Sequence, residues 1–304
     1  MGTVKTSNKI LITGANGQLG QKLILNCLEQ NIDFLATANS EKRFLSCPDE
    51  VFEVMDITNV SQVKKVVKQY KPTHIINAAA MTNVDLCEEQ KELCYAINRD
   101  GVKNLLEAAI EENAHLIQIS TDFIFDGKKE CYSEEDEPNP LGVYGKSKWE
   151  GEKVLNENGY PKISILRTSI LYGQGENLKK PNLFVWAMNE LRKGNTLNIV
   201  NDQFRTPTYV DDLARACLLV IDKNAYGVYN ISGEKRASMY DFILDVADYL
   251  KVSHQQINPI SSEELSQKAP RPLSSGLNII KAKTILGYRP TKFIETLSRI
   301  DLVD

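Results

Sequence analysis

Short apolar runs of strand type alternate with longer helix-type patterns along the first half of the chain. The apolar runs cover residues 10–13, 34–37, 51–54, 74–77, 116–120 and 163–167. Helical spacing fills the stretches 18–29, 60–70, 88–97, 100–113 and 142–156. This order is typical of βαβ units, in which a helix crosses between two parallel strands. The sequence therefore predicts an α/β fold with a doubly wound parallel sheet of the Rossmann type.

The regular alternation stops after residue 168. Helix-type stretches near 182–193, 211–222, 238–250 and 291–302 are joined by polar segments that contain Pro and Gly. We expect residues 1–168 to form the Rossmann domain, completed by about 205–230, and residues 169–304 to form mainly a smaller substrate-binding lobe. No low-complexity linker separates the two parts, so we expect them to share an interface.

Composition narrows the classes of function. A net charge of −4 over 304 residues gives no positive surface field for nucleic acid or an anionic membrane. The six cysteines contain no CxxC pair and the three histidines are scattered, so metal-ligand spacing is absent. No apolar run reaches the roughly 18 residues of a membrane helix, and the first ten residues are too polar for a signal peptide. We expect a cytoplasmic protein with reduced thiols and no bound metal.

A glycine-rich turn follows the first apolar run and opens a helix. Gly14, Gly17 and Gly20 give the spacing GxxGxxG. Glycine permits positive φ and close backbone approach, so a pyrophosphate can lie on the exposed N–H groups at the positive end of the helix. Such a turn can also be purely structural, and other strand ends must support a ligand.

Three further strand ends favour a dinucleotide, because ligands of doubly wound sheets bind there. Asp56 can accept a hydrogen bond from an adenine amino group, or it can cap the helix that starts near Val60. Residues 77–80, Asn-Ala-Ala-Ala, can let a flat cofactor lie against the backbone, or they can serve strand-end packing. Asn98 stands at the head of a helix, where it can also be an N-cap.

The position that reads the adenosine ribose follows the second strand. Residues 38–40 offer no acid there, and Lys42 and Arg43 lie just beyond. These two basic residues can pair with a 2′-phosphate, or they can belong to a solvated loop. The sequence therefore favours NADPH over NADH.

Tyr144 and Lys148 are four residues apart on a helical pattern, which places them on one face. A tyrosine with an ordinary pKa of about 10 needs a nearby cation to work as an acid–base catalyst at neutral pH. Lys148 can supply that cation and can also hydrogen-bond the nicotinamide ribose. Thr121 ends the strand just before this helix, so its hydroxyl can bind a substrate carbonyl, or it can bond local backbone. The three together predict a carbonyl reductase.

Seven stretches carry a resemblance to a known family: residues 14–20, 77–85, 120–127, 144–152, 166–173, 201–208 and 271–277. They resemble the extended short-chain dehydrogenase/reductases, most closely the dTDP-4-dehydrorhamnose reductase family, over nearly the whole chain. The resemblance implies B-face hydride transfer from NADPH, or NADH, to the C4 ketone of a nucleotide-linked deoxysugar. It places this reaction in the biosynthesis of dTDP-rhamnose for cell-surface polysaccharide. In that reaction Tyr144 donates the proton, with Thr121 and Lys148 as its partners.

The same resemblance implies which residues line the site. The cofactor would be held by Gly14, Asn16, Gly17, Gln18, Leu19, Asp56, Ile57, Ala78, Ala79, Asn98 and Lys148. The nucleotide sugar would be held by Val84, Asp122, Asn182, Gln203, Arg205, Arg271 and Ser275. The Arg271 guanidinium can clamp a pyrophosphate in bidentate fashion, or it can form a surface ion pair.

Two positions depart from the family pattern, and other functions stay open. Phe123 stands where the family usually has a tyrosine and Ile170 where it has a tryptophan, which bears on the sugar. The regulatory beta subunit of methionine adenosyltransferase also resembles this family, so a non-catalytic NADP-binding subunit is a second hypothesis. A reductase or epimerase of another nucleotide sugar is a third. A nucleotide sugar is the expected partner, and a homodimer is a candidate.

Overall fold

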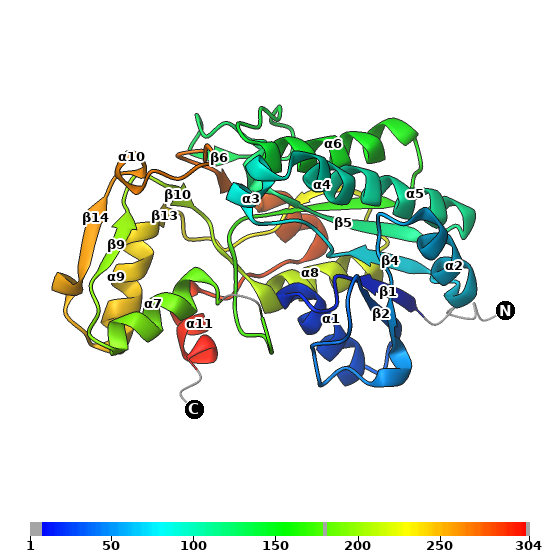
Figure 1. Ribbon diagram of the computed structural model, residues 1–304, viewed down its shortest axis with the longest axis horizontal. Coiled ribbons are helices and arrows are strands. Elements are labelled where there is room, and N and C mark those ends of the chain that lie inside the picture. The colour runs from blue at the N-terminus through cyan, green and yellow to red at the C-terminus, as the bar shows by residue number, and fades with distance from the viewer. Residues whose placement is uncertain (1–7, 179–180, 302–304) are drawn as a thin grey trace.

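A parallel sheet of seven strands forms the centre of the larger lobe (Figure 1). The computed structural model describes residues 8–178 and 181–301. Across the sheet the strands are β12 (Gly227–Asn230), β7 (Ile163–Thr168), β5 (His115–Thr121), β4 (His74–Asn77), β1 (Lys9–Thr13), β2 (Asp33–Ala38) and β3 (Phe52–Val54). Every neighbouring pair is parallel. The chain winds outward in both directions from β1 and β4, which confirms the predicted doubly wound sheet and opens a crevice at the carboxyl ends of these strands.

Helices cover both faces of the sheet (Figure 1). On one face lie α1 (Gln18–Glu29) and α8 (Val210–Asp222), and on the other lie α2 (Val60–Tyr70), α5 (Gly101–Glu111) and α6 (Val143–Asn158). Alternate strand residues feed the two cores: Ile10 and Ile12 pack under α1 and α8, whereas Leu11 packs under the other helices. Both faces of the strands are therefore apolar, as a covered parallel sheet requires.

The smaller lobe has its own core. It packs α7 (Leu183–Arg192), α9 (Met239–Leu250) and α11 (Phe293–Ile300) against the paired strands β9 (Leu197–Val200) and β14 (Ile257–Ile260). Phe293 is at its centre, with ring centroids 4.9 Å from Phe184 and 4.8 Å from Phe242. Such edge-to-face packing stabilises a small core.

Several short elements complete the fold. They are α3 (Val84–Glu89), α4 (Lys91–Tyr95), α10 (Ser262–Leu265), β6 (Cys131–Tyr132), β8 (Leu171–Tyr172), β10 (Phe204–Arg205), β11 (Thr208–Tyr209), β13 (Ala237–Ser238) and β15 (Gly276–Leu277). The segment 210–230 lies in the larger lobe, where α8 packs beside α1 and β12 extends the sheet beside β7. In the described part of the chain, no helix has the length and apolar character needed to cross a membrane.

Two sequence expectations differ from the structure. The expected helix 88–97 is wrong: Asn83 caps α3 by accepting the Leu86 N–H (3.2 Å), and the chain turns at Gln90 before α4 begins. A π-helical turn, Ala96–Asp100, then joins α4 to α5. β12 was not expected, and residue 302 of the expected helix 291–302 lies outside the described residues.

Candidate active site

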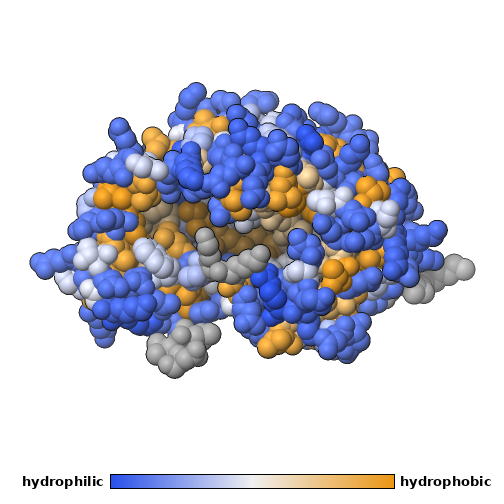
Figure 2. Space-filling model, in the orientation of Figure 1, coloured by the Kyte–Doolittle hydropathy of each residue, from blue (hydrophilic) through white to orange (hydrophobic). Residues whose placement is uncertain are grey.

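The carboxyl ends of the sheet strands face the smaller lobe. Figure 2 shows that the surface is hollowed between the two lobes and that apolar side chains lie within the hollow. The glycine-rich turn and the ends of β4 and β5 all approach this region, because β1, β4 and β5 are neighbours in the sheet. The crevice is therefore where the predicted site residues can meet.

The glycine-rich turn needs its glycines for close packing. Gly14 has a φ of +70°, and a Cβ there would lie 2.7 Å from the carbonyl carbon of Ala78 and 2.8 Å from the Ala79 nitrogen. Gly17 is the N-cap of α1, so no side chain at this position accepts a hydrogen bond from the first N–H groups of the helix. The N–H groups of the first helical turn thus remain for an anion at the positive helix end.

Asn16 fastens the glycine-rich turn to the loop after β2. Its Nδ2 donates to the Glu41 carbonyl (2.9 Å), and its Oδ1 accepts the Arg43 N–H (2.8 Å). Asn177 donates to the Arg43 carbonyl from the other side (3.0 Å). The backbone of Arg43 is therefore held on both sides, and its buried Nε has no hydrogen-bond partner among the described residues.

The two basic residues after β2 differ in their surroundings. Lys42 forms an ion pair with Asp49, and its ammonium also donates to the Cys47 carbonyl (2.6 Å). Its charge is therefore already balanced. Arg43, with its orphaned Nε, is the residue of the two that can hold a 2′-phosphate.

The remaining predicted cofactor residues lie around the same turn. Gln18 donates to the Gly173 carbonyl (2.6 Å), which draws the segment after β8 over the start of α1. Leu19 is buried beneath the turn. The Ala79 N–H donates to the Thr13 hydroxyl (3.2 Å), so the segment after β4 is held beside β1. These contacts shape the floor of the crevice.

Asp56 and Ile57 follow β3. Asp56 accepts hydrogen bonds from the backbone and hydroxyl of Thr58 (2.9 and 2.8 Å). The alternative that it caps α2 is wrong, because Asn59 is the N-cap and accepts the Gln62 N–H (3.1 Å). Ile57 is buried against the start of α5.

Asn98 is not an N-cap either, because it lies inside the π-helical turn. Its Oδ1 accepts the Met81 N–H and its Nδ2 donates to the Met81 carbonyl, both at 3.0 Å. The same Nδ2 donates to the Ser147 hydroxyl (3.0 Å). Asn98 therefore joins the segment after β4 to the helix that carries Tyr144 and Lys148.

Thr121, Tyr144 and Lys148 come together at the end of β5. Burial raises the pKa of Tyr144 well above its ordinary value, while a hydrogen bond with Thr121 acts in the opposite direction. Lys148 is 4% exposed, and its ammonium donates to the Ile119 carbonyl (2.7 Å). Burial lowers the pKa of Lys148 to about 8. A neutral phenol, a hydroxyl and a cation thus share one corner of the crevice.

Gly145 sets the distance between α6 and β5. A Cβ at this position would overlap the Phe123 carbonyl oxygen and lie 3.0 Å from its carbon. The glycine lets the helix lie directly on the strand end, which brings Tyr144 to Thr121. Sequence reasoning used the spacing of Tyr144 and Lys148 but missed this residue between them.

Glu88 is a second residue that sequence reasoning missed. Its Oε1 accepts the Val143 N–H (2.7 Å), and Gly142, the N-cap of α6, has no side chain to do so. Glu88 therefore caps the helix of Tyr144 from α3. An N-cap without a side chain was a signal that the acceptor must come from elsewhere.

On the substrate side, three of the predicted residues meet in a buried cluster behind Thr121. Asp122 receives hydrogen bonds from Ser169 and Ser275, and the Arg205 Nε lies 3.8 Å from its Oδ2. Burial raises the pKa of Asp122, and Arg205 opposes that rise.

Three other predicted substrate residues lie on separate elements. Gln203 donates to Ser262 (2.9 Å), and Asn182 caps α7 by accepting the Val185 N–H (3.2 Å). Val84 is the first residue of α3 and is half-buried. The structure therefore does not join these three side chains.

Arg271 forms a bidentate ion pair with Asp85, with N–O distances of 3.2 and 2.9 Å. The hydrogen bonds from Arg271 lower the pKa of Asp85. Of the two alternatives for Arg271, the ion pair is the one this structure contains. It links the segment before β15 to α3, beside Val84.

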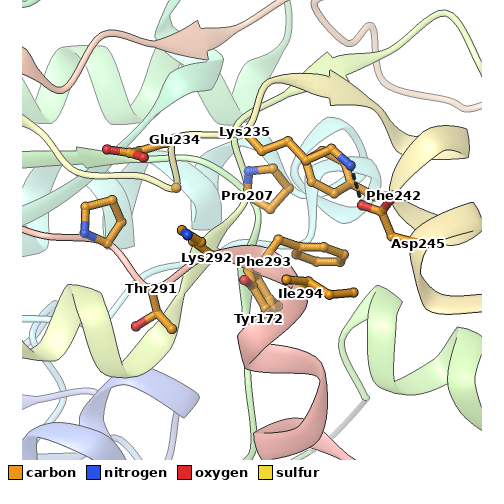
Figure 3. Close-up of a pocket in the computed structure, with 12 residues that line it drawn as sticks. Tyr172, Pro207, Glu234, Lys235, Phe242, Asp245, Thr291, Lys292, Phe293 and Ile294 are labelled. Atoms are coloured by element: carbon orange, nitrogen blue, oxygen red, sulfur yellow. Dashed lines mark hydrogen bonds and ion pairs between the residues drawn. The ribbon is translucent and has the colours of Figure 1, made fainter. Parts of the chain in front are cut away.

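One cavity lies elsewhere, between loop 233–235, α9 and α11 (Figure 3). It measures about 520 Å³, Phe242 and Phe293 form its apolar wall, and Lys235 pairs with Asp245 at its edge. None of the predicted catalytic, cofactor or substrate residues lines it. Within residues 8–178 and 181–301, no three His, Cys, Asp or Glu side chains form a group that could hold a metal ion.

Comparisons with known proteins show the family to which this chain belongs. The model of the RmlD substrate binding domain family matches residues 8–301. A dTDP-4-dehydrorhamnose reductase from Aggregatibacter actinomycetemcomitans is 37% identical over 96% of this chain and 98% of that protein. The crystal structure of a dTDP-4-dehydrorhamnose reductase from Bacillus anthracis in complex with NADP superposes with a TM-score of 0.84 at 32% identity, covering 97% of this chain and 99% of that one. The methionine adenosyltransferase 2 subunit beta of Xenopus tropicalis is 31% identical over 92% of this chain and 84% of that protein.

Proposed function

The chain belongs to the RmlD substrate binding domain family, and from this premise we propose that it reduces dTDP-4-dehydrorhamnose to dTDP-rhamnose with NADPH. One observation carries the proposal: Thr121, Tyr144 and Lys148 meet at the end of β5, beside the glycine-rich turn. A proton donor and a dinucleotide cradle in one crevice are what carbonyl reduction requires.

The residues present fit the dinucleotide. A Cβ at Gly14 would fill the space against Ala78, and the buried Nε of Arg43 lacks a partner within the described residues. The pyrophosphate would lie on the N–H groups at the start of α1, and Arg43 would hold the 2′-phosphate. When bound, the cofactor supplies the hydride, and the protein provides the proton.

Tyr144 is the proton donor. The phenol is protonated at neutral pH, since the ordinary pKa of tyrosine is about 10 and burial raises that of Tyr144 further, so it can give its proton to the carbonyl oxygen as that oxygen becomes an alkoxide. The Thr121 hydroxyl holds the same oxygen, and the nearby Lys148 ammonium stabilises the phenolate left behind. Both groups thus act on charge that develops during the reaction.

The test is turnover of NADPH with dTDP-4-dehydrorhamnose by wild-type protein and by Tyr144→Phe. The variant keeps the ring packed on Phe123, whose centroid is 5.8 Å away, and loses only the proton donor. We expect a loss of about a hundredfold or more in kcat. Tyr160→Phe is the matched control, since its hydroxyl donates to the Ala114 carbonyl (2.9 Å) at the opposite end of β5. Equal turnover in wild type and Tyr144→Phe would contradict the mechanism.

A second function has support from the similarity to methionine adenosyltransferase 2 subunit beta, which is 31% identical in Xenopus tropicalis and 30% in Xenopus laevis. That reading expects NADP binding without turnover of any nucleotide keto sugar, together with binding to a partner enzyme. A panel of keto sugars separates the two functions. The panel also tests the identity of the sugar, because two positions, Phe123 and Ile170, depart from the family pattern.

We also infer a cytoplasmic location from the reduced thiols, and we propose a homodimer as the assembly. All six cysteines are free. Light scattering on the purified protein gives the mass, which is 34.2 kDa for one chain.

A further inference from the structure

A buried carboxylate lies one helical turn after Lys148 on α6. Glu152 is fully buried and follows Lys148 by four residues, so both side chains lie on the same face of the helix. The Lys148 ammonium donates to the Ile119 carbonyl (2.7 Å), and the hydroxyl of the next residue, Ser120, donates to the Glu152 Oε1. The lysine and the carboxylate therefore meet β5 at consecutive residues.

An arginine on β7 holds the carboxylate of Glu152 from the other strand. The Arg167 Nη2 donates to Oε2 (2.7 Å), and its Nε lies 3.2 Å from both oxygens. Arg167 is 3% exposed and pairs with Ser120 in the register of β5 and β7. Groups of this chain thus fix the carboxylate in the interior, where it can act on the reaction only through its neighbours.

The groups around Lys148 come from three elements. β5 presents the Ile119 carbonyl and α4 presents the Cys94 thiol, while α6 carries Tyr144 and Glu152 on the face of Lys148. Burial lowers the pKa of Lys148 to about 8, and Glu152, followed by Cys94, opposes that decrease. A buried charge acts strongly on its neighbours because the effective dielectric constant there is low. Glu152 is therefore the main group that favours the ammonium over the neutral amine.

The reaction needs this ammonium at one moment. When Tyr144 gives up its proton, a phenolate forms in a buried place, and only a charged Lys148 stabilises it. An ammonium has three N–H groups, and the Ile119 carbonyl takes one of them, so two remain for acceptors in the crevice.

We propose that Glu152 is a positioning residue of the reductase: its fixed carboxylate keeps a proton on the Lys148 amine, so that the ammonium is present when Tyr144 becomes a phenolate. The inference rests on the proposed reduction, because it assigns a role within that reaction. Glu152 touches neither cofactor nor substrate and acts through Lys148 alone.

The test is the pH profile of kcat in Glu152→Gln, measured with NADPH and dTDP-4-dehydrorhamnose. The amide keeps the shape of the side chain and removes its charge, so Lys148 should lose its proton about one pH unit lower than in wild type. We expect kcat to fall about fivefold at pH 8 and to stay within about twofold of wild type at pH 6, where the amine is still charged. A carboxylate that only supports the fold would instead lower kcat by the same factor at both pH values, which would overturn the inference.

Two further variants separate charge from structure. Glu150→Gln is the matched control, because it removes another carboxylate of α6 that pairs with an arginine, Arg99 (3.3 Å), but does not act on Lys148. We expect it to keep the wild-type pH profile. Glu152→Asp disturbs the contacts with Ser120 and Arg167 but keeps the charge, so its profile should shift by less than half as much as that of Glu152→Gln. Equal shifts in the two variants at position 152 would contradict the proposal.

A double variant guards against loss of folding, since Glu152→Gln leaves the buried Arg167 without its ion-pair partner. Glu152→Gln combined with Arg167→Met removes both charges and should regain thermal stability relative to Glu152→Gln alone. Arg167 is not among the charges that act on Lys148, so the double variant should keep the lowered pH profile. A profile that returns to that of wild type would overturn the role of Glu152.

The charge of Lys148 can also be followed without turnover. In protein labelled with ¹³C at lysine, the Cε signal of Lys148 is identified by its loss in Lys148→Met, and its shift is measured against pH. We expect a midpoint of about 8 in wild type and one at least about one pH unit lower in Glu152→Gln. Equal midpoints would overturn the inference. If wild-type protein reduces no keto sugar, the proposed function fails, and this titration still decides whether Glu152 keeps the proton on Lys148.

Discussion

Gly145→Ala should separate the position of α6, which carries Tyr144, from the stability of that helix. The added Cβ would overlap the Phe123 carbonyl oxygen and lie 3.0 Å from both the Phe123 carbonyl carbon and the Pro140 Cβ, whereas ordinary contact begins at 3.4 Å. Neither the strand-end backbone nor the proline can rotate away. The start of α6 must therefore move outward by about 1 Å, which overpacking makes unfavourable by about 1–3 kcal/mol.

Tyr144 moves with that turn of the helix. A misplacement of about 1 Å reduces the rate by about a hundredfold, so we expect kcat to fall by that factor while the Kd of NADPH changes little. The assay is turnover of NADPH with dTDP-4-dehydrorhamnose, with calorimetric unfolding measured on the same samples.

Gly159→Ala is the control at the other end of α6. Gly159 has a φ of +77° and no atom within 4 Å of an added Cβ, so alanine there strains the backbone without pushing the helix. We expect a similar loss of stability and an unchanged kcat. A Gly145→Ala protein with wild-type kcat would refute the argument that this glycine sets the distance to Thr121.

Three further predictions concern charge. Arg43→Ala should raise the KM for NADPH at least about tenfold and leave the KM for NADH unchanged, because the 2′-phosphate loses a charge-assisted hydrogen bond. Lys42→Ala, the control, should change neither KM. Equal effects of Arg43→Ala on both cofactors would contradict the assignment of Arg43 to the 2′-phosphate. The kcat should decline as the pH rises through about 8. Burial lowers the pKa of Lys148 to about 8, so its ammonium loses its charge there. A pH profile of kcat that stays flat to about pH 10 would contradict this role of Lys148. Burial lowers the pKa of His74 to about 4 and that of His115 to about 3. Below about pH 6.5 these histidines therefore bind protons in the unfolded chain but not in the folded chain. As the pH falls from about 6.5 to 4, the free energy of unfolding should decrease by up to about 1.4 kcal/mol per histidine for each pH unit. Urea unfolding of His115→Asn should show a shallower slope in that window, and an unchanged slope would exclude His115 as its source.

The sheet and its helices were largely predictable, because each strand or helix has a local pattern. The bounds of α1 and α2 agree with the predicted ranges 18–29 and 60–70. The turn at Ala96–Asp100 was not predictable in this way. It depends on Asn98 binding Met81 and Ser147, residues 17 and 49 positions away. β12 is four residues at the sheet edge, too short for a period to stand out.

The positions of the site residues followed from the strand ends, but their partners did not. Lys42 and Arg43 are equivalent in sequence, and they differ because Asp49 lies beside one and Asn16 and Asn177 hold the other. Ser275 is 153 residues from Asp122, and no local pattern relates them. Motifs thus locate the crevice, whereas the charge balance within it depends on the tertiary packing.

The spacing of Tyr144 and Lys148 places both side chains on one face of α6, but that face could lie at any distance from β5. The structure supplies the distance through residues outside the motif. Glu88 holds the first turn of the helix, and Asn98 holds Ser147, which lies between Tyr144 and Lys148 in the chain. At Gly145, the absence of a Cβ avoids an overlap with the Phe123 carbonyl oxygen. Loss of the Glu88 contact or of Gly145 should therefore reduce kcat before it reduces cofactor affinity, since the proposed dinucleotide cradle is the glycine-rich turn after β1.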